Sequence, residues 1–289
     1  MEISNSPKIG VISGLERHKI RKKNGKIKIK ISGGGQHAAS ITIFILIILT
    51  IYGFCTFDYK DLNFLNASYE LLANLRTVFL HPKPTHFTLL EGLYQVIITL
   101  GLAFLTTLIG AAFALIIGLF AAKNLSNEYL SNAIKAFVAF IRAVPTVLWV
   151  LIFAVAAGLG SVAAVIGLSL HSVAYLTKVY SESYEEVDSG VIEALKASGA
   201  SFWQIVFQAI LPSTTTSLLA WTFMRFEINF TNAVAMGAAA GAGGIGFDLF
   251  MAGSFYYDLR SVGVIAYLIL SFALILEIFS TRIKNKYLT

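Results

Sequence analysis

The feature that most constrains this chain is a series of long apolar stretches. An α-helix rises about 1.5 Å per residue, so about 20 apolar residues cross the hydrocarbon core of a bilayer. The stretches that meet this length cover residues 38–57, 94–122, 136–158, 161–181, 213–235 and 262–281. They predict an all-α, polytopic membrane protein with about six transmembrane helices.

Composition supports a place in the membrane. Hydrophobic residues make up 56% of the chain and charged residues 13%, whereas a soluble domain carries about a quarter charged residues. The single cysteine, Cys55, cannot form an internal disulfide, and the histidines and this cysteine lack the spacing of a metal site. We therefore expect no metal and no cofactor.

The lysines and arginines predict the orientation of the chain. Sixteen of the 22 fall on the side of the N-terminus, four fall on the opposite side, and Arg142 and Arg225 lie inside apolar stretches. Because positive loops stay on the cytoplasmic side, both termini are expected to be cytoplasmic. The basic residues 17–30 are interpreted as an orientation signal that meets anionic membrane lipid, and we expect no nucleic acid partner.

The apolar stretches also divide the chain into segments. We expect a basic cytoplasmic N-terminal segment at 1–37, a first transmembrane helix at 38–57, an external loop at 58–93, a membrane core at 94–281 and a cytoplasmic tail at 282–289.

The external loop carries apolar residues at helical spacing. These residues are Leu65, Tyr69, Leu72, Leu75 and Phe79, and prolines at 82 and 84 end the pattern. The spacing predicts an interfacial helix. Such a helix could contact an external binding protein or rest on lipid headgroups, and the sequence leaves both readings open.

A short polar stretch between two apolar ones indicates a soluble partner. Residues 182–212 form a connection on the predicted cytoplasmic side, and residues 193–199 within it read Glu-Ala-Leu-Lys-Ala-Ser-Gly. A membrane protein has little reason to keep an amphipathic helix with a glycine cap here unless a partner binds it. The alternative is an ordinary amphipathic helix that lies on the membrane surface.

This stretch resembles the EAA loop of ABC importer permeases, in which Glu-Ala-Ala, a later Gly and Ile-x-Leu-Pro form a helix that sits in a cleft of the ATPase subunit. The chain departs from the pattern at two positions, because Leu195 replaces the third motif residue and Ala209 stands where Ile is expected. The resemblance implies that the residues that couple the chain to the ATPase are Glu193, Ala194, Gly199, Leu211 and Pro212.

Two arginines inside apolar stretches need a polar partner, since a charge at mid-membrane costs about 2.5 to 3.5 kcal/mol. Arg142 lies just before Pro145, which permits a kink. Arg225 and Asn229 are four residues apart and share a helix face, whereas Glu227 points elsewhere.

From this arrangement we predict that Glu227 pairs with Arg142 or Lys178. We also predict that Arg225 and Asn229 face the translocation path. Structural ion pairs of both arginines are an equally good interpretation.

The same segments are similar to the phosphonate branch of these importers, in which Arg-Ala-x-Pro and Arg-Phe-Glu-Ile-Asn occur in two spans. The resemblance covers about residues 90–280, and it implies a core that contains Arg142, Pro145, Arg225, Glu227 and Asn229. A phosphonate or phosphate-like oxyanion would suit the forked donors of guanidinium groups. Another solute, such as an amino acid or a metal chelate, stays open.

Residues 241–246 read Gly-Ala-Gly-Gly-Ile-Gly and match a dinucleotide-binding fingerprint. That fingerprint needs a strand before it and a helix after it, and here an apolar stretch precedes it. In the permeases that the chain resembles, such a turn follows the penultimate span. We interpret Gly241, Gly243, Gly244 and Gly246 as a packing and gating turn, with a plain re-entrant loop as the alternative.

No Gly-x-x-x-x-Gly-Lys-Ser/Thr motif occurs in the chain, so we expect a transport subunit without an ATPase site of its own. The resemblance implies the type I ABC importer permease fold in a bacterial cytoplasmic membrane, with alternating access as the mechanism. The implied partners are a cytoplasmic ABC ATPase dimer, an external substrate-binding protein and a second permease copy. A membrane-embedded enzyme that uses His171 and an ion channel are the competing classes.

Overall fold

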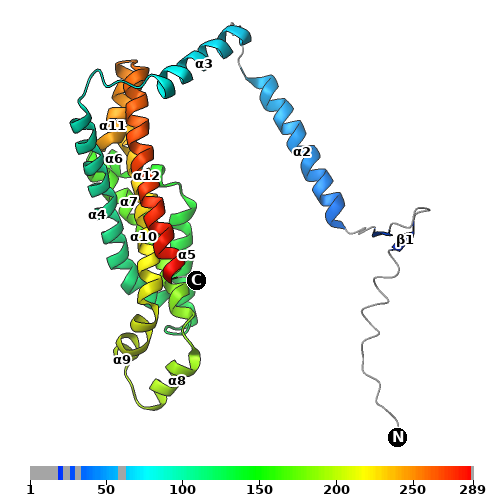
Figure 1. Ribbon diagram of the computed structural model, residues 1–289. Helices are drawn as coiled ribbons and strands as arrows, with labels where there is room; N and C mark the ends of the chain where they lie inside the picture. Colours follow the sequence, from blue (N-terminus) through cyan, green and yellow to red (C-terminus); the bar gives the residue numbers. More distant parts are fainter. Residues whose placement is uncertain (1–18, 22–26, 30–33, 58–62, 288–289) are drawn as a thin grey trace. The chain divides into compact units, whose positions relative to one another are not determined.

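The computed structural model describes residues 19–21, 27–29, 34–57 and 63–287. The chain divides into two units, Met1–Ala67 and Ser68–Thr289, each of which is described by itself (Figure 1).

The first unit holds a small β-ribbon and one apolar helix. Strand β1 (Lys19–Arg21) pairs antiparallel with β2 (Ile27–Ile29). Helix α2 (Gly34–Thr56) begins four residues before the first predicted span, 38–57, and ends one residue before the end of that span. The ribbon is a small exception to the all-α prediction. The predicted N-terminal segment 1–37 ends inside α2, and its residues 1–18, 22–26 and 30–33 lie outside the described residues.

The second unit is a bundle of helices (Figure 1). Its elements are α3 (Phe64–Leu80, which begins in the first unit), α4 (Leu89–Ala121), α5 (Glu128–Ala143), α6 (Thr146–Ala157), α7 (Ser161–Glu185), α8 (Ser189–Ala197), α9 (Phe202–Ile205), the π-helical turn η1 (Val206–Ile210), α10 (Leu211–Ala240), α11 (Gly244–Phe250), the π-helical turn η2 (Met251–Phe255) and α12 (Leu259–Tyr287). Because α12 runs on through residue 287, most of the predicted tail is helical.

Four helices of the described chain are long and apolar enough to cross a membrane, namely α2, α4, α7 and α12. Two bent helix pairs raise the number to six if each pair forms one span. One pair is α5 with α6, and the other joins residues 202–240 to 244–255 with a bend of 44°. The prediction of a polytopic, helical membrane protein is confirmed.

The predicted span 136–158 is not one straight helix, because α5 and α6 meet at 86°. Pro145 has no N–H to donate and pushes the residue before it into an extended conformation, and Val144 has φ −86° and ψ 126°. The indole N–H of Trp149 donates to the carbonyl of Ile141 (2.9 Å), which satisfies one of the freed carbonyls. The sequence predicted a kink here, and the structure shows a sharp corner.

Helices α4 and α7 approach one another closely through small residues. A Cβ atom built on Gly110 of α4 would lie 2.6 Å from the Cβ of Ser172 on α7. Farther along the same pair of helices, a Cβ on Gly118 would lie 3.2 Å from the Tyr184 ring and 3.3 Å from Tyr180 Cβ. Glycine therefore sets the distance between the two backbones.

Apolar side chains form two main core clusters at opposite ends of this bundle. One lies among α4, α7, α10, α11 and α12 and includes Val96, Leu168 and Phe230. The other includes Tyr180 and Ile192, and it joins the bundle to α8 and α9. Figure 1 shows α8 and α9 at one end of the bundle and α11 at the other.

Helix α3 covers the predicted interfacial stretch, and its last turn is fastened to α12. The Tyr267 hydroxyl donates to the carbonyl of Phe79 (2.7 Å), and Gly263 lies against the carbonyl of Val78. The apolar side chains of Leu65 and Leu72 stay exposed. Both interpretations of this helix, as a partner contact or as a headgroup contact, remain predictions.

Replacing Gly110 by Ala should destabilise the bundle, because the new methyl group would collide with Ser172 and the α7 backbone. We expect the free energy of unfolding to fall by about 1 to 3 kcal/mol, as for an overpacked core. Gly101→Ala in the same helix is the control, since no atom lies within 4 Å of its new methyl group. Thermal unfolding in detergent measures both variants, and equal stability of the two would contradict the close packing.

Candidate functional site

The loop between α7 and α10 is built from two short capped helices. The carboxylate of Asp188 accepts the N–H of Gly190 (2.8 Å) and caps α8. Gly199 ends the helix with φ +82°, and the N–H of Ala200 donates to the carbonyl of Leu195 (3.0 Å). Glycine adopts this left-handed conformation at no steric cost, which explains its place here.

The loop is anchored on one side and open on the other. Ile192 is 2% exposed and packs into the core cluster that contains Tyr180, so α8 is fixed to the bundle. Glu193 and Ala194 lie on the exposed side of α8. The loop therefore presents a surface whose position follows the bundle.

Two aromatic residues extend this exposed surface beyond α8. Trp203 is 52% exposed and Phe207 is 64% exposed, and their rings stack with centroids 6.1 Å apart. Large apolar side chains gathered on one exposed surface are typical of a contact region. We call the exposed side of α8, α9 and η1 the loop surface.

Leu211 and Pro212 begin α10 directly after the π-helical turn η1. The N–H of Leu211 donates to the carbonyl of Val206, five residues back. Pro212 has no N–H and its ring would crowd the carbonyl four residues before it, so the wider turn relieves the conflict. Residues 202–240 nevertheless form one continuous helical stretch, which connects the loop to the middle of the bundle.

A polar cluster lies inside the bundle around Arg225. Arg225 is 2% exposed, and its Nε donates to the hydroxyl of Ser172 (3.1 Å). One terminal guanidinium nitrogen lies 3.2 Å from Nδ1 of His171, and the guanidinium carbon lies 5.1 Å from the centre of the Tyr175 ring. This arginine therefore joins α10 to α7.

Asn229 continues the cluster one turn farther along α10. It is 0% exposed, and its amide nitrogen donates to Thr107 (2.8 Å), Ser172 (2.9 Å) and Thr106 (3.3 Å). The predicted shared face of Arg225 and Asn229 is therefore present. Both side chains are buried within one chain, so their place on a translocation path stays a prediction.

The predicted ion pair of Glu227 is wrong for this structure. Lys178 pairs with Glu182 one turn along α7 (2.8 Å), and within the described chain Glu227 has an ion pair with neither Lys178 nor Arg142. Glu182 is four residues from Lys178 on the same helix and is always within reach. Lys178 therefore pairs with Glu182 and not with Glu227 on α10. Arg142 and Pro145 both lie exposed at the α5–α6 corner.

Sequence reasoning missed most of the α7 side of the cluster. His171 was considered alone, and Ser172 and Tyr175 were not singled out. The available signal was the spacing of His171 and Tyr175, which are four residues apart and so share a helix face.

The glycine-rich turn lies between α10 and α11 and not in a βαβ unit. Gly241, Gly243 and Gly244 have φ values of +64°, +80° and +70°. A Cβ atom on Gly246 would collide with the carbonyl of Val234 in α10, and one on Gly244 would collide with Thr99. The turn thus folds α11 tightly against its neighbours, while a gating role and the re-entrant alternative stay predictions.

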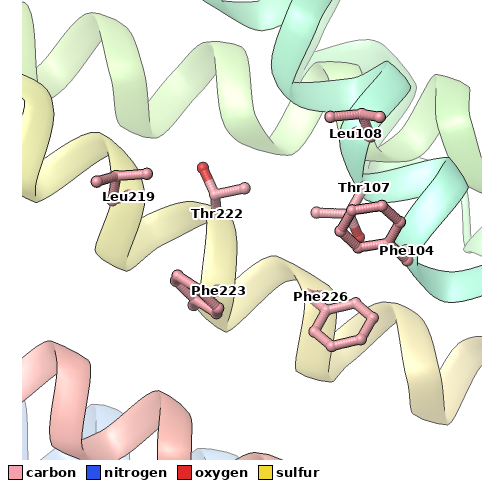
Figure 2. A pocket seen from close by; sticks show the side chains of 7 residues that line it. All are labelled: Phe104, Thr107, Leu108, Leu219, Thr222, Phe223 and Phe226. Atoms are coloured by element: carbon pink, nitrogen blue, oxygen red, sulfur yellow. The ribbon is translucent and has the colours of Figure 1, made fainter. Parts of the chain in front are cut away.

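An apolar pocket lies between α4 and α10 (Figure 2). Its volume is about 240 Å³, and phenyl rings and aliphatic side chains surround it. Its lining residues are Phe104, Thr107, Leu108, Leu219, Thr222, Phe223 and Phe226. A pocket without charged groups is unsuited to a small anion, so an anion site has to be sought elsewhere.

Residues 114–288 match the family described as "Binding-protein-dependent transport system inner membrane component". They include the loop surface, the glycine-rich turn and the α7 and α10 residues of the polar cluster. The chain belongs to this family. This membership confirms the resemblance on which the coupling residues were named.

Curated relatives of this family member include phosphate and phosphite permeases. It is 32% identical over 153 residues to the phosphate-import permease protein PhnE of Mycolicibacterium smegmatis, an alignment that covers 53% of the chain and 29% of that relative. It is also 32% identical over 190 residues to the phosphite transport system permease protein PtxC of Stutzerimonas stutzeri, with 65% and 68% covered. The chain thus spans less than a third of the first relative's length and about two thirds of the second's.

Among solved structures, an inward-facing methionine ABC transporter, MetNI, superimposes with a TM-score of 0.59 and 22% identity over 69% of this chain and 95% of that one. An amino acid ABC transporter superimposes with a TM-score of 0.56 and 18% identity, covering 78% and 99%. These similarities confirm the predicted type I ABC importer permease fold.

Leu has nearly the same side-chain size as Asn. Replacing Asn229 by Leu therefore removes the amide that joins α4, α7 and α10 and changes the packing little. We expect the free energy of unfolding to fall by about 1 kcal/mol, the usual size of hydrogen bonds between membrane helices. Thr231→Val is the control, since its exposed hydroxyl bonds only to the carbonyl of Ile228 in its own helix. Thermal unfolding in detergent measures the stability of both variants. If both are as stable as the unchanged protein, the proposed role of Asn229 is contradicted.

Proposed function

We propose that this chain is the membrane-spanning subunit of an ABC importer that translocates a small phosphorus oxyanion. The observation that carries the proposal is the loop surface, which is exposed toward a partner yet anchored in the core of the bundle. The relatives named for phosphate and phosphite support the choice of substrate class, and so do the basic side chains among the membrane helices.

The proposed partner at the loop surface is a cytoplasmic ABC ATPase dimer. Glu193 and Ala194 face outward for contact, while Ile192 ties α8 to α7. The continuous helical stretch from residue 202 to residue 240 passes the position of Arg225. Movement of the loop by the ATPase would therefore reach the polar cluster through one rigid element.

We further propose that two copies of the chain assemble and alternate between an outward-open and an inward-open state. An external binding protein would deliver the anion at the end of the bundle that holds α11. Both termini and the loop surface would then lie in the cytoplasm.

A second candidate is a permease of the same fold for an amino acid. The observation that favours it is a set of methionine permeases among the relatives, for example one of Bacillus subtilis that is 29% identical over 167 residues. Transport of methionine but not of phosphate, phosphite or methylphosphonate would decide for this candidate.

Replacing Gly199 by Val should uncouple transport from ATP hydrolysis. The new side chain has space, since no atom lies within 4 Å of the added Cβ, but φ +82° is strained for a β-branched residue. We expect uptake by proteoliposomes that contain the ATPase and binding protein to fall by about tenfold or more. Gly199→Asn is the matched control, because Asn tolerates this conformation, and it should keep most of the uptake.

The loop surface should react with reagents only from the cytoplasmic side. Ser198 is exposed, and Cys55 is the single cysteine, so Ser198→Cys in a Cys55→Ser background carries one thiol. A membrane-impermeant maleimide should label inverted membrane vesicles and leave intact cells unlabelled. Labelling of intact cells would reverse the proposed orientation.

A further inference from the structure

The charge of Arg225 is not neutralised within the part of the chain that the structure describes. Its guanidinium is buried, and no carboxylate of the described residues forms an ion pair with it. Its hydrogen-bond partners are the neutral groups of Ser172 and His171, and its charge faces the ring of Tyr175. A buried cation without an anion is costly in a membrane, which makes it a candidate for function.

The contact with Arg225 fixes the tautomer of His171. A guanidinium group has donors and no acceptor, so Nδ1 of His171 must accept and the ring proton must sit on Nε2. No other hydrogen bond of this ring occurs in the part of the chain that the structure describes, and the ring is half-buried. The Nε2–H group is therefore a donor without a partner.

A second arginine lies on α5, the helix that packs against this part of α7. Ile141 is buried against Leu170 and Ala174 of α7, one residue before and three residues after His171. Arg142 follows Ile141 directly on α5, so its backbone lies close to the turn of α7 that carries His171. Its side chain is exposed and has no ion pair within the described residues.

The charged residues around His171 leave a net positive charge there. Farther along α7, Lys178 and Glu182 form a pair (2.8 Å) and so cancel one another. Glu227 lies two residues from Arg225 on α10 and therefore points to another side of that helix. The net local charge thus comes from Arg142 and Arg225.

We propose that Arg142 and the Nε2–H group of His171 bind one tetrahedral phosphorus oxyanion, with Arg225 as the positioning residue behind them. This site deepens the proposed function and rests on it, since it names where the translocated anion is held within the membrane. The guanidinium fork of Arg142 supplies charged N–H donors, and His171 adds a neutral donor. Arg225 holds the imidazole in the required tautomer and adds positive charge at the base of the site.

A phospholipid headgroup carries the same chemistry as a free phosphonate, so the test has to separate the two sources. The complete chain, with the subunits that co-purify with it, is placed in nanodiscs of phosphatidylcholine alone and titrated with methylphosphonate. Broadening of the methyl proton resonance of methylphosphonate reports the dissociation constant. A second series uses nanodiscs that contain phosphatidylglycerol, which offers an anionic headgroup.

We expect Arg142→Gln and His171→Asn each to weaken methylphosphonate binding by about tenfold, the effect of one charge-assisted hydrogen bond or more. The amide oxygen of Asn at position 171 can still accept from Arg225, while this shorter side chain places no N–H group at the position of Nε2, so the variant removes the outward donor. Lys178→Gln is the control, because this cation lies on the same helix but is paired with Glu182, and it should change binding less than twofold.

Three results would overturn the site. The first is that the unchanged chain does not bind methylphosphonate, and the second is that Arg142→Gln binds it as tightly as the unchanged chain. The third is that the methylphosphonate signal is lost once phosphatidylglycerol is present, which would assign the site to lipid. Failure of the Gly199→Val test with binding intact would count against the proposed coupling alone. Loss of binding with coupling intact would count against this site alone.

Discussion

The close approach of α4, α7 and α10 is the interaction on which the rest of the structure depends. In hydrocarbon the helices gain nothing from burying apolar side chains, so close packing and interhelical hydrogen bonds have to hold them together. Gly110 lets α4 touch Ser172 of α7, and Asn229 then reaches hydroxyl groups on both helices. The bundle around Arg225 exists because these three helices lie so near one another.

The position of the loop surface is set by its attachment to α7 and α10. Tyr180 belongs to α7 and packs in one cluster with Ile192 of α8, while η1 leads without a break into α10. A force on α8 or α9 would therefore act on two of the three central helices at once. This arrangement gives a physical reason for a polar loop with capped helices between two apolar spans.

The sequence predicted what depends on local rules and missed what depends on contacts between distant residues. Apolar runs located the helices, Pro145 marked the corner, and the EAA-like stretch identified the family. The angle of 86° did not follow, because a proline permits a bend without setting its size. Glu227 was assigned a partner on another helix, yet Lys178 pairs within its own helix, and the link between Arg225 and His171 joins residues 54 positions apart.

The central claim is that a separate ATPase binds the loop surface from the cytoplasmic side. The most direct test is a cysteine cross-link from Ala194→Cys, which lies exposed on α8, in a Cys55→Ser background. With a short bifunctional maleimide, the account predicts a cross-linked product between this chain and the co-purified ATPase, with a yield that changes when ATP is bound. A thiol at position 194 that reacts with external reagents, and never with the ATPase, would contradict it.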